Sequence, residues 1–122
     1  VVLPAVAIGL LSTAVLNLNN MRDIVSDVTA NKITLAVKLG AEKAKKYHYF
    51  LIITAIVLSV LFGVIYYKSP LNLIYFVAYI PLGLHLKKVR SVTNPKDFDP
   101  ELKKLALTTV LLSLLLGIGH LL

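Results

Sequence analysis

The segment NLNNMRDIVSD, residues 17–27, directly follows VVLPAVAIGLLSTAVL, an apolar run of residues 1–16. Such a run is typical of a membrane-buried helix, so the polar segment begins where a span meets water. At about 100° per residue, one helical face carries Thr13, Asn17, Asn20, Asp23 and Asp27. A polar stripe on a hydrophobic helix is costly in lipid unless it faces a cavity or a partner helix. We expect this stripe to be the functional centre.

The composition indicates an integral membrane protein. Of the 122 residues, 57% are hydrophobic and 16% are charged, which is more apolar surface than a soluble domain of this size could bury. These residues contain no Cys, which excludes disulfides and thiolate metal sites among them. The net charge of +7 comes without interleaved aromatic residues that would stack on bases, so we expect a lipid bilayer and no nucleic acid as partner.

The apolar stretches predict an all-α fold, a polytopic transmembrane helical bundle. Spans are expected at about residues 1–18, 47–67, 71–86 and 105–122. The first helix is expected to continue through the polar segment to about Asp27 or Val28, and residues 33–39 to form a short amphipathic turn. Asn31 and Gly40 should break the helix, and residues 41–44 favour a new one. Residues 87–104 are expected to form a polar loop, with turns at Asn94-Pro95 and Asp99-Pro100.

The positive charges predict the orientation of the spans. Six Lys or Arg residues lie within residues 22–46 and six more within residues 87–104, whereas the connection between the second and third spans carries only Lys68. Because cytoplasmic connections are enriched in Lys and Arg, the first and third connections are expected on the cytoplasmic side of the cell (inner) membrane. The two aspartates of the stripe would then face the cytoplasm.

The start of the chain indicates a longer protein. Val1 already lies in an apolar segment, with no basic leader and no signal-peptide cleavage site. We therefore expect residues 1–122 to be the C-terminal part of a membrane protein. Partner residues of the stripe would then belong to the N-terminal half of the same protein.

The spacing of the two aspartates favours a cation site. Asp23 and Asp27, at i and i+4, point the same way from one helix turn and would repel each other without a cation. Oxygen ligands favour Mg²⁺, which often completes its shell with substrate phosphates. Arg22 and Lys32 bracket the carboxylates and could hold diphosphate oxygens, while Asn20, with Asn17, would offer amide groups to the same cavity.

The polar stripe is also compatible with two different kinds of membrane protein. A DxxxD spacing is common in solvated helices, so the chain could be a structural membrane subunit. It could also be a segment of a transporter whose aspartates bind a transported cation. His48 and His85 are expected to lie at the membrane surface and not to act as ligands.

Two segments resemble a known family. NNMRDIVSD, residues 19–27, and NKITLAVKLG, residues 31–40, are similar to the second aspartate-rich motif of the UbiA superfamily of intramembrane prenyltransferases. They most resemble the branch that transfers a polyprenyl group to 1,4-dihydroxy-2-naphthoate in menaquinone biosynthesis. Asn31 stands where the family usually has Gly, and both residues tolerate left-handed geometry.

The resemblance implies one domain of about nine membrane helices around a cavity, with two aspartate-rich motifs facing each other. Residues 1–122 would supply helices six to nine, and without the first motif they would be inactive alone. Asp23 and Asp27 would bind Mg²⁺ and act in catalysis, while Asn20, Arg22 and Lys32 would bind the polyprenyl diphosphate. The aromatic acceptor would be 1,4-dihydroxy-2-naphthoate, with 4-hydroxybenzoate, haem or a chlorophyll precursor as alternatives within the superfamily.

Overall fold

The computed structural model describes residues 2–65 and 77–121, with side chains up to residue 117. In chain order the helices are α1 (Val2–Arg22), α2 (Ile24–Thr29), α3 (Leu35–Leu39), α4 (Ala41–Ile65), α5 (Tyr79–Ser91), the 3₁₀ helix η2 (Pro95–Phe98) and α6 (Asp99–Leu121).

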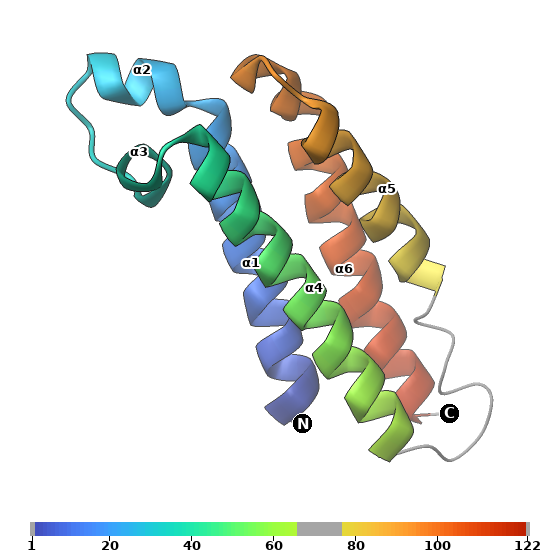
Figure 1. The fold of residues 1–122 in the computed structure, drawn as a ribbon. Helices are drawn as coiled ribbons and strands as arrows, with labels where there is room; N and C mark the ends of the chain where they lie inside the picture. Colours follow the sequence, from blue (N-terminus) through green and yellow to red (C-terminus); the bar gives the residue numbers. More distant parts are fainter. Residues whose placement is uncertain (1, 66–76, 122) are drawn as a thin grey trace.

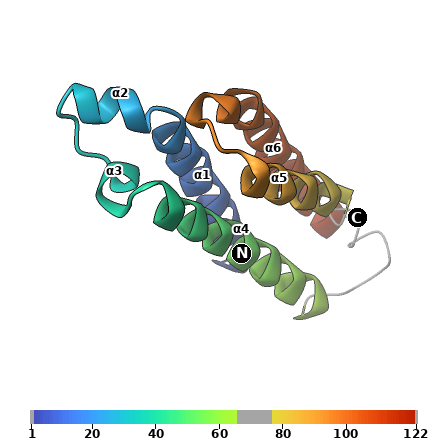
Figure 2. The same ribbon diagram turned by 45° about the horizontal axis from the view of Figure 1, so that its top comes forward.

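The four longest helices form a bundle. Helix α1 packs against α4 and α6, and α5 packs against the same two helices. Figures 1 and 2 show α2, α3 and the α5–α6 connection gathered at one end of this bundle, with the two termini at the other. The first and third connections therefore lie at the same end, as the four-span prediction requires. The all-α prediction is confirmed for the described residues.

Small and branched side chains alternate where α1 meets α4. Ala7, Leu11, Ala14 and Leu18 are fully buried and recur every three or four residues, which puts them on one face of α1. Facing positions of α4 include the fully buried Ala55. Small residues let membrane helices approach closely, so this seam holds the two helices together by packing.

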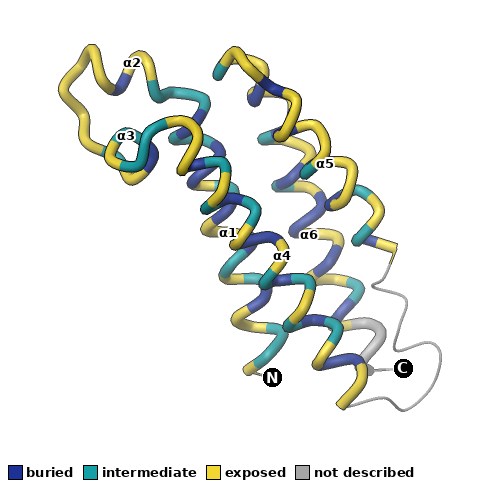
Figure 3. Tube along the Cα trace, in the orientation of Figure 1, coloured by how far each residue is buried: buried dark blue, intermediate teal, exposed yellow. Residues whose placement is uncertain are grey.

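The outer surface of the bundle is apolar. Figure 3 shows buried positions on the inward faces of the helices and exposed positions outside, and the exposed set on α4 includes Phe50, Ile53 and Val57. Among the described residues, α1 and α4, with 21 and 25 residues, are long and apolar enough to cross a membrane. An apolar exterior of this kind is suited to lipid or to neighbouring helices.

The helices of the second half differ from the predicted boundaries. Residues 71–76 of the predicted third span lie outside the described residues, and α5 continues to Ser91 instead of ending at residue 86. Helix α6 begins at Asp99, six residues before the predicted span. The polar loop predicted for residues 87–104 is therefore wrong in extent, because only residues 92–94 are non-helical.

The predicted Asp99-Pro100 turn is the start of α6. Proline is favoured in the first turn of a helix, and the carboxylates of Asp99 and Glu101 lie near the positive end of the helix dipole. Asn94 does initiate a turn, because its side chain accepts a hydrogen bond from the Lys96 backbone N–H at 3.2 Å and caps η2.

The first helix is also shorter than predicted. Helix α1 ends at Arg22, and Asp23 lies outside helical geometry, with φ −94° and ψ 11°. The Ser26 hydroxyl donates to the carbonyl oxygen of Asp23 at 3.0 Å, which stabilises the bend. Helix α2 consequently turns away from the axis of α1 (Figure 1).

The segment from α2 to α4 follows the predicted breaks. Asn31 has a left-handed φ of 57° and Gly40 a φ of 83°. The predicted short turn at residues 33–39 is the helix α3, whose N-cap Thr34 accepts a hydrogen bond from the Val37 N–H at 3.2 Å. Helix α4 begins at Ala41, as expected.

Candidate functional site

Arg22 joins the end of α1 to the start of α6. Its Nε donates to Asp23 Oδ1 at 3.0 Å and its Nη2 donates to Asp23 Oδ2 at 3.3 Å, which makes a bidentate ion pair. Its Nη1 donates to Asp99 Oδ1 at 2.7 Å, and Nη2 also donates to Asn19 Oδ1 at 2.7 Å. Charge-assisted bidentate pairing of this kind fixes the geometry of both groups and also stabilises the pair. The guanidinium therefore fixes the orientation of the Asp23 carboxylate.

Asp23 is an ionised carboxylate at neutral pH. The hydrogen bonds from Arg22 hold the pKa of Asp23 below its ordinary value, and the positive charge of Lys32 adds to this effect. Desolvation acts in the opposite direction but is the smaller influence. The group is thus kept in the form that accepts hydrogen bonds and binds cations.

Asp27 lies one turn after Asp23. The Asp27 N–H donates to the Asp23 carbonyl oxygen at 2.8 Å, so the i, i+4 relation survives the bend. The Asp27 residue is 9% exposed, and its carboxylate oxygens, which have no hydrogen bond or ion pair with a described residue, keep contact with solvent. An unpaired carboxylate that solvent reaches is free to bind a cation.

Both aspartates carry the oxygen donors that a Mg²⁺ site requires, and Asp23, but not Asp27, lines the cavity between the α1–α2 bend and the α5–α6 connection. Carboxylate oxygens are the ligands that Mg²⁺ prefers, and it commonly uses one or two of them together with substrate phosphates. Within the described part of the chain, no group of three or more His, Asp or Glu side chains could hold a metal ion. Asp23 and Asp27 are thus two candidate ligands and not a complete cluster of protein ligands among the described residues.

The remaining predicted residues occupy separate positions. Asn20 is half-buried on α1, and its side chain has no hydrogen bond with a described residue, so its amide stays available. Lys32 is exposed after α2, and its backbone N–H donates to the Asp27 carbonyl oxygen at 2.8 Å. Asn17 does not share their surroundings, because it is buried and donates from Nδ2 to the Ala44 carbonyl oxygen at 3.2 Å.

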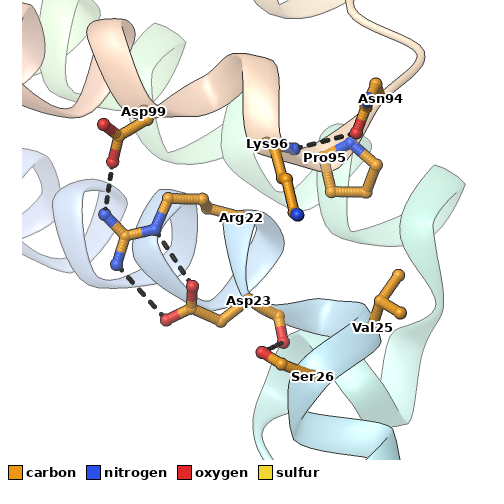
Figure 4. A pocket seen from close by; sticks show the side chains of 8 residues that line it. All are labelled: Arg22, Asp23, Val25, Ser26, Asn94, Pro95, Lys96 and Asp99. Atoms are coloured by element: carbon orange, nitrogen blue, oxygen red, sulfur yellow. Dashed lines mark hydrogen bonds and ion pairs between the residues drawn. The ribbon is translucent and has the colours of Figure 1, made fainter.

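A cavity of about 710 Å³ opens beside Asp23, between the α1–α2 bend and the α5–α6 connection. Figure 4 shows the side chains around it. Its polar lining consists of Arg22, Asp23, Ser26, Asn94, Lys96 and Asp99. The last three come from a segment about 70 residues later in the chain, and the sequence did not predict their role. The only local signal was Asn94-Pro95, which indicates a turn but not what the turn faces.

His48 and His85 were expected at the surface, and this expectation is wrong. His48 is fully buried and His85 is 3% exposed, and their Nε2 atoms are 2.8 Å apart. His85 Nδ1 lies 3.1 Å from Glu101 Oε1, and Lys104 Nζ lies 3.1 Å from Glu101 Oε2. His48 lies four residues after the buried Ala44, so both side chains are on the inward face of α4. The network there joins α4, α5 and α6.

Comparison with known proteins identifies the family. The model of the UbiA prenyltransferase family matches residues 1–115. The chain belongs to the UbiA prenyltransferase family. This finding confirms the resemblance seen in residues 19–40. No solved structure matches the chain.

Curated relatives in the UbiA prenyltransferase family are similar along nearly all of the chain. A protein named 1,4-dihydroxy-2-naphthoate octaprenyltransferase from Haemophilus influenzae is 37% identical over 98% of this chain, covering 39% of its own length. Proteins of the same name from Escherichia coli and Mycobacterium tuberculosis are 36% and 37% identical over 97% and 90% of the chain. The chain spans 37–39% of the length of these three relatives.

Proposed function

We propose that the chain is the C-terminal part of a membrane prenyltransferase that transfers a polyprenyl group from polyprenyl diphosphate to 1,4-dihydroxy-2-naphthoate. Its relatives carry the name of that reaction. The observation that carries the proposal is the unpaired, solvent-accessible carboxylate of Asp27, one turn from the ionised Asp23. The two residues supply carboxylate oxygens just beyond the end of α1, a helix long enough to cross a membrane.

Each site residue has a role that follows from its contacts. Asp23 and Asp27 would hold Mg²⁺, which supplies positive charge that stabilises a leaving diphosphate when it is bound. Arg22 keeps the Asp23 carboxylate in one orientation through its two hydrogen bonds. Asn20 and Lys32 have free polar groups for the diphosphate oxygens. The apolar helices would shield the reacting carbon from water and hold the prenyl tail.

The location follows from the charges. Because Lys and Arg gather in the first and third connections, we place the aspartate pair on the cytoplasmic side of the cell membrane. The full domain would contain the four predicted spans of this chain and an N-terminal half that brings further ligands for the cation. The N-terminal half would thus complete the set of ligands around the cation.

A membrane assay of the full-length protein tests the proposal. Membranes would receive Mg²⁺, a polyprenyl diphosphate and either 1,4-dihydroxy-2-naphthoate or 4-hydroxybenzoate. We expect prenylated naphthoquinol from the wild type and a loss of about 100-fold or more in kcat/KM for Asp23→Asn, since the charge acts on the transition state. Asp97→Asn is a matched control, because Asp97 is exposed on η2 and outside the cavity lining.

Three results would each overturn a stated part of the proposal. Product from 4-hydroxybenzoate alone would overturn the acceptor. Full activity of Asp23→Asn would overturn the site. Absence of any prenylated product with either acceptor would overturn the reaction as proposed.

A further inference from the structure

The cavity beside Asp23 contains one lysine whose charge is not paired. Arg22 already donates to Asp23, Asp99 and Asn19. The Lys96 ammonium, in contrast, has no ion pair and no hydrogen bond with any described residue. Figure 4 shows its side chain extending from η2 into the space above Ser26. A free ammonium in a cavity is a binding group for an anion.

The backbone that carries Lys96 is held firmly. Its N–H donates to the Asn94 side-chain oxygen at 3.2 Å, and Pro95 fixes the first position of η2. Phe98 anchors the turn in the core at 4% exposure. On the other side of the turn, Lys45 Nζ donates to the Val92 carbonyl oxygen at 2.5 Å. The turn therefore fixes where the Lys96 backbone lies beside the cavity, while its exposed side chain is free to reach a ligand.

The charges of the cavity indicate how an anion could be accepted. Asp23 and Asp99 share the single guanidinium of Arg22, so the positive charge of Lys96 brings the lining to neutrality. A cation held by Asp23, as proposed above, would make the cavity positive overall. A diphosphate carried by that cation would then have Lys96 as the free donor on the opposite wall.

We propose that Lys96 is a diphosphate-binding residue, contributed by the α5–α6 connection to the cavity that Asp23 lines. This inference rests on the proposed function, because the diphosphate is the ligand that the proposed function assigns to the site. It adds to the site a residue that lies 73 positions after Asp23 in the sequence. The ammonium would donate to the phosphate oxygens and stay in place after the bond to the prenyl group breaks.

Kinetics of four forms of the full-length protein test the inference. These are the wild type, Lys96→Gln, Lys96→Arg and the control Lys103→Gln, which removes the same charge from an exposed position on α6. In nanodiscs of phosphatidylcholine, Lys96→Gln should raise the KM for polyprenyl diphosphate and the inhibition constant of inorganic pyrophosphate by about tenfold or more. Lys96→Arg should stay within about threefold of wild type because it keeps a cationic donor, and Lys103→Gln should match wild type. The KM for the aromatic acceptor should not change.

Direct binding of inorganic pyrophosphate with Mg²⁺, measured by calorimetry, separates this inference from the proposed function. Weaker binding in Lys96→Gln, with binding kept in Lys103→Gln, supports the role of Lys96 even if no acceptor is prenylated. If Lys96→Gln and Lys103→Gln bind pyrophosphate equally well and have the same KM for polyprenyl diphosphate, the inference is overturned. An effect that appears only in anionic lipid would also overturn it, because Lys96 would then bind lipid headgroups instead of the diphosphate.

Discussion

At the scale of single residues, Arg22 organises the site. Its guanidinium bonds to a residue next to it and to Asp99, 77 positions away. The sequence predicts that Arg22 binds diphosphate, and this stays a prediction; in the structure its guanidinium bonds to Asp23, Asp99 and Asn19. These contacts hold the Asp23 carboxylate and tie the start of α6 to the end of α1.

The ion pair predicts how stability depends on pH. Because the folded pKa of Asp23 is lowered, its stabilising effect is complete above the ordinary value of about 3.8 and is lost as the pH falls through the folded value. The difference in Tm between wild type and Asp23→Asn should be constant from about pH 5 to pH 8 and shrink below about pH 4. Thermal unfolding of the full-length protein in detergent measures it. A difference that widens on acidification would contradict the prediction.

At the scale of elements, a buried polar network fixes α6 against α4 and α5. Glu101 accepts from His85 Nδ1–H, so His85 Nε2 carries a lone pair and accepts from His48 Nε2–H. These tautomers are assigned from the hydrogen bonds. The network begins two residues after Asp99, so it also helps to hold the segment that lines the cavity.

Loss of the network should destabilise the bundle. Glu101→Ala leaves the buried Nδ1–H of neutral His85 without its acceptor and should lower the free energy of unfolding by about 1–3 kcal/mol. Glu101→Gln, which keeps an acceptor oxygen, should cost less. Denaturant unfolding in detergent, followed by circular dichroism, measures both. The exposed Asp97→Ala should change stability by less than about 0.5 kcal/mol, and an equally small effect in Glu101→Ala would show that the network is not stabilising.

At the scale of the whole molecule, the helices separate charge from apolar surface. The two Lys- and Arg-rich connections gather at one end of the bundle (Figure 1), and the sides of the bundle expose large apolar residues. This arrangement predicts one orientation in the membrane, with the site at the positively charged face.

Cysteine labelling tests that orientation. The chain has no Cys, so Ala30→Cys and Thr93→Cys can be introduced singly into a cysteine-free form of the full-length protein. Both positions are exposed, and a membrane-impermeant maleimide should label them only when the cytoplasmic face is accessible. Lys68→Cys, in a connection outside the described residues, should be labelled from the other side. Labelling of all three from one face would contradict the topology.

The sequence by itself determined the features that depend on local patterns. Long apolar runs indicate membrane helices by their length and composition, and the family motif lies within one continuous segment. Asn31 and Gly40 were predictable breaks because left-handed geometry favours those residue types. The spacing of Asp23 and Asp27 was also local, since i and i+4 remain one turn apart even across the bend.

Tertiary structure alone decided which distant side chains share the site. Asp99 and Lys96 belong to a segment that the sequence presents as a polar loop, and they reach the cavity only because α6 packs beside α1. His48 became a core residue because α5 and α6 bring it His85 and Glu101 as partners. Such pairings depend on how helices far apart in the chain are oriented, and hydrophobic periodicity does not carry that information.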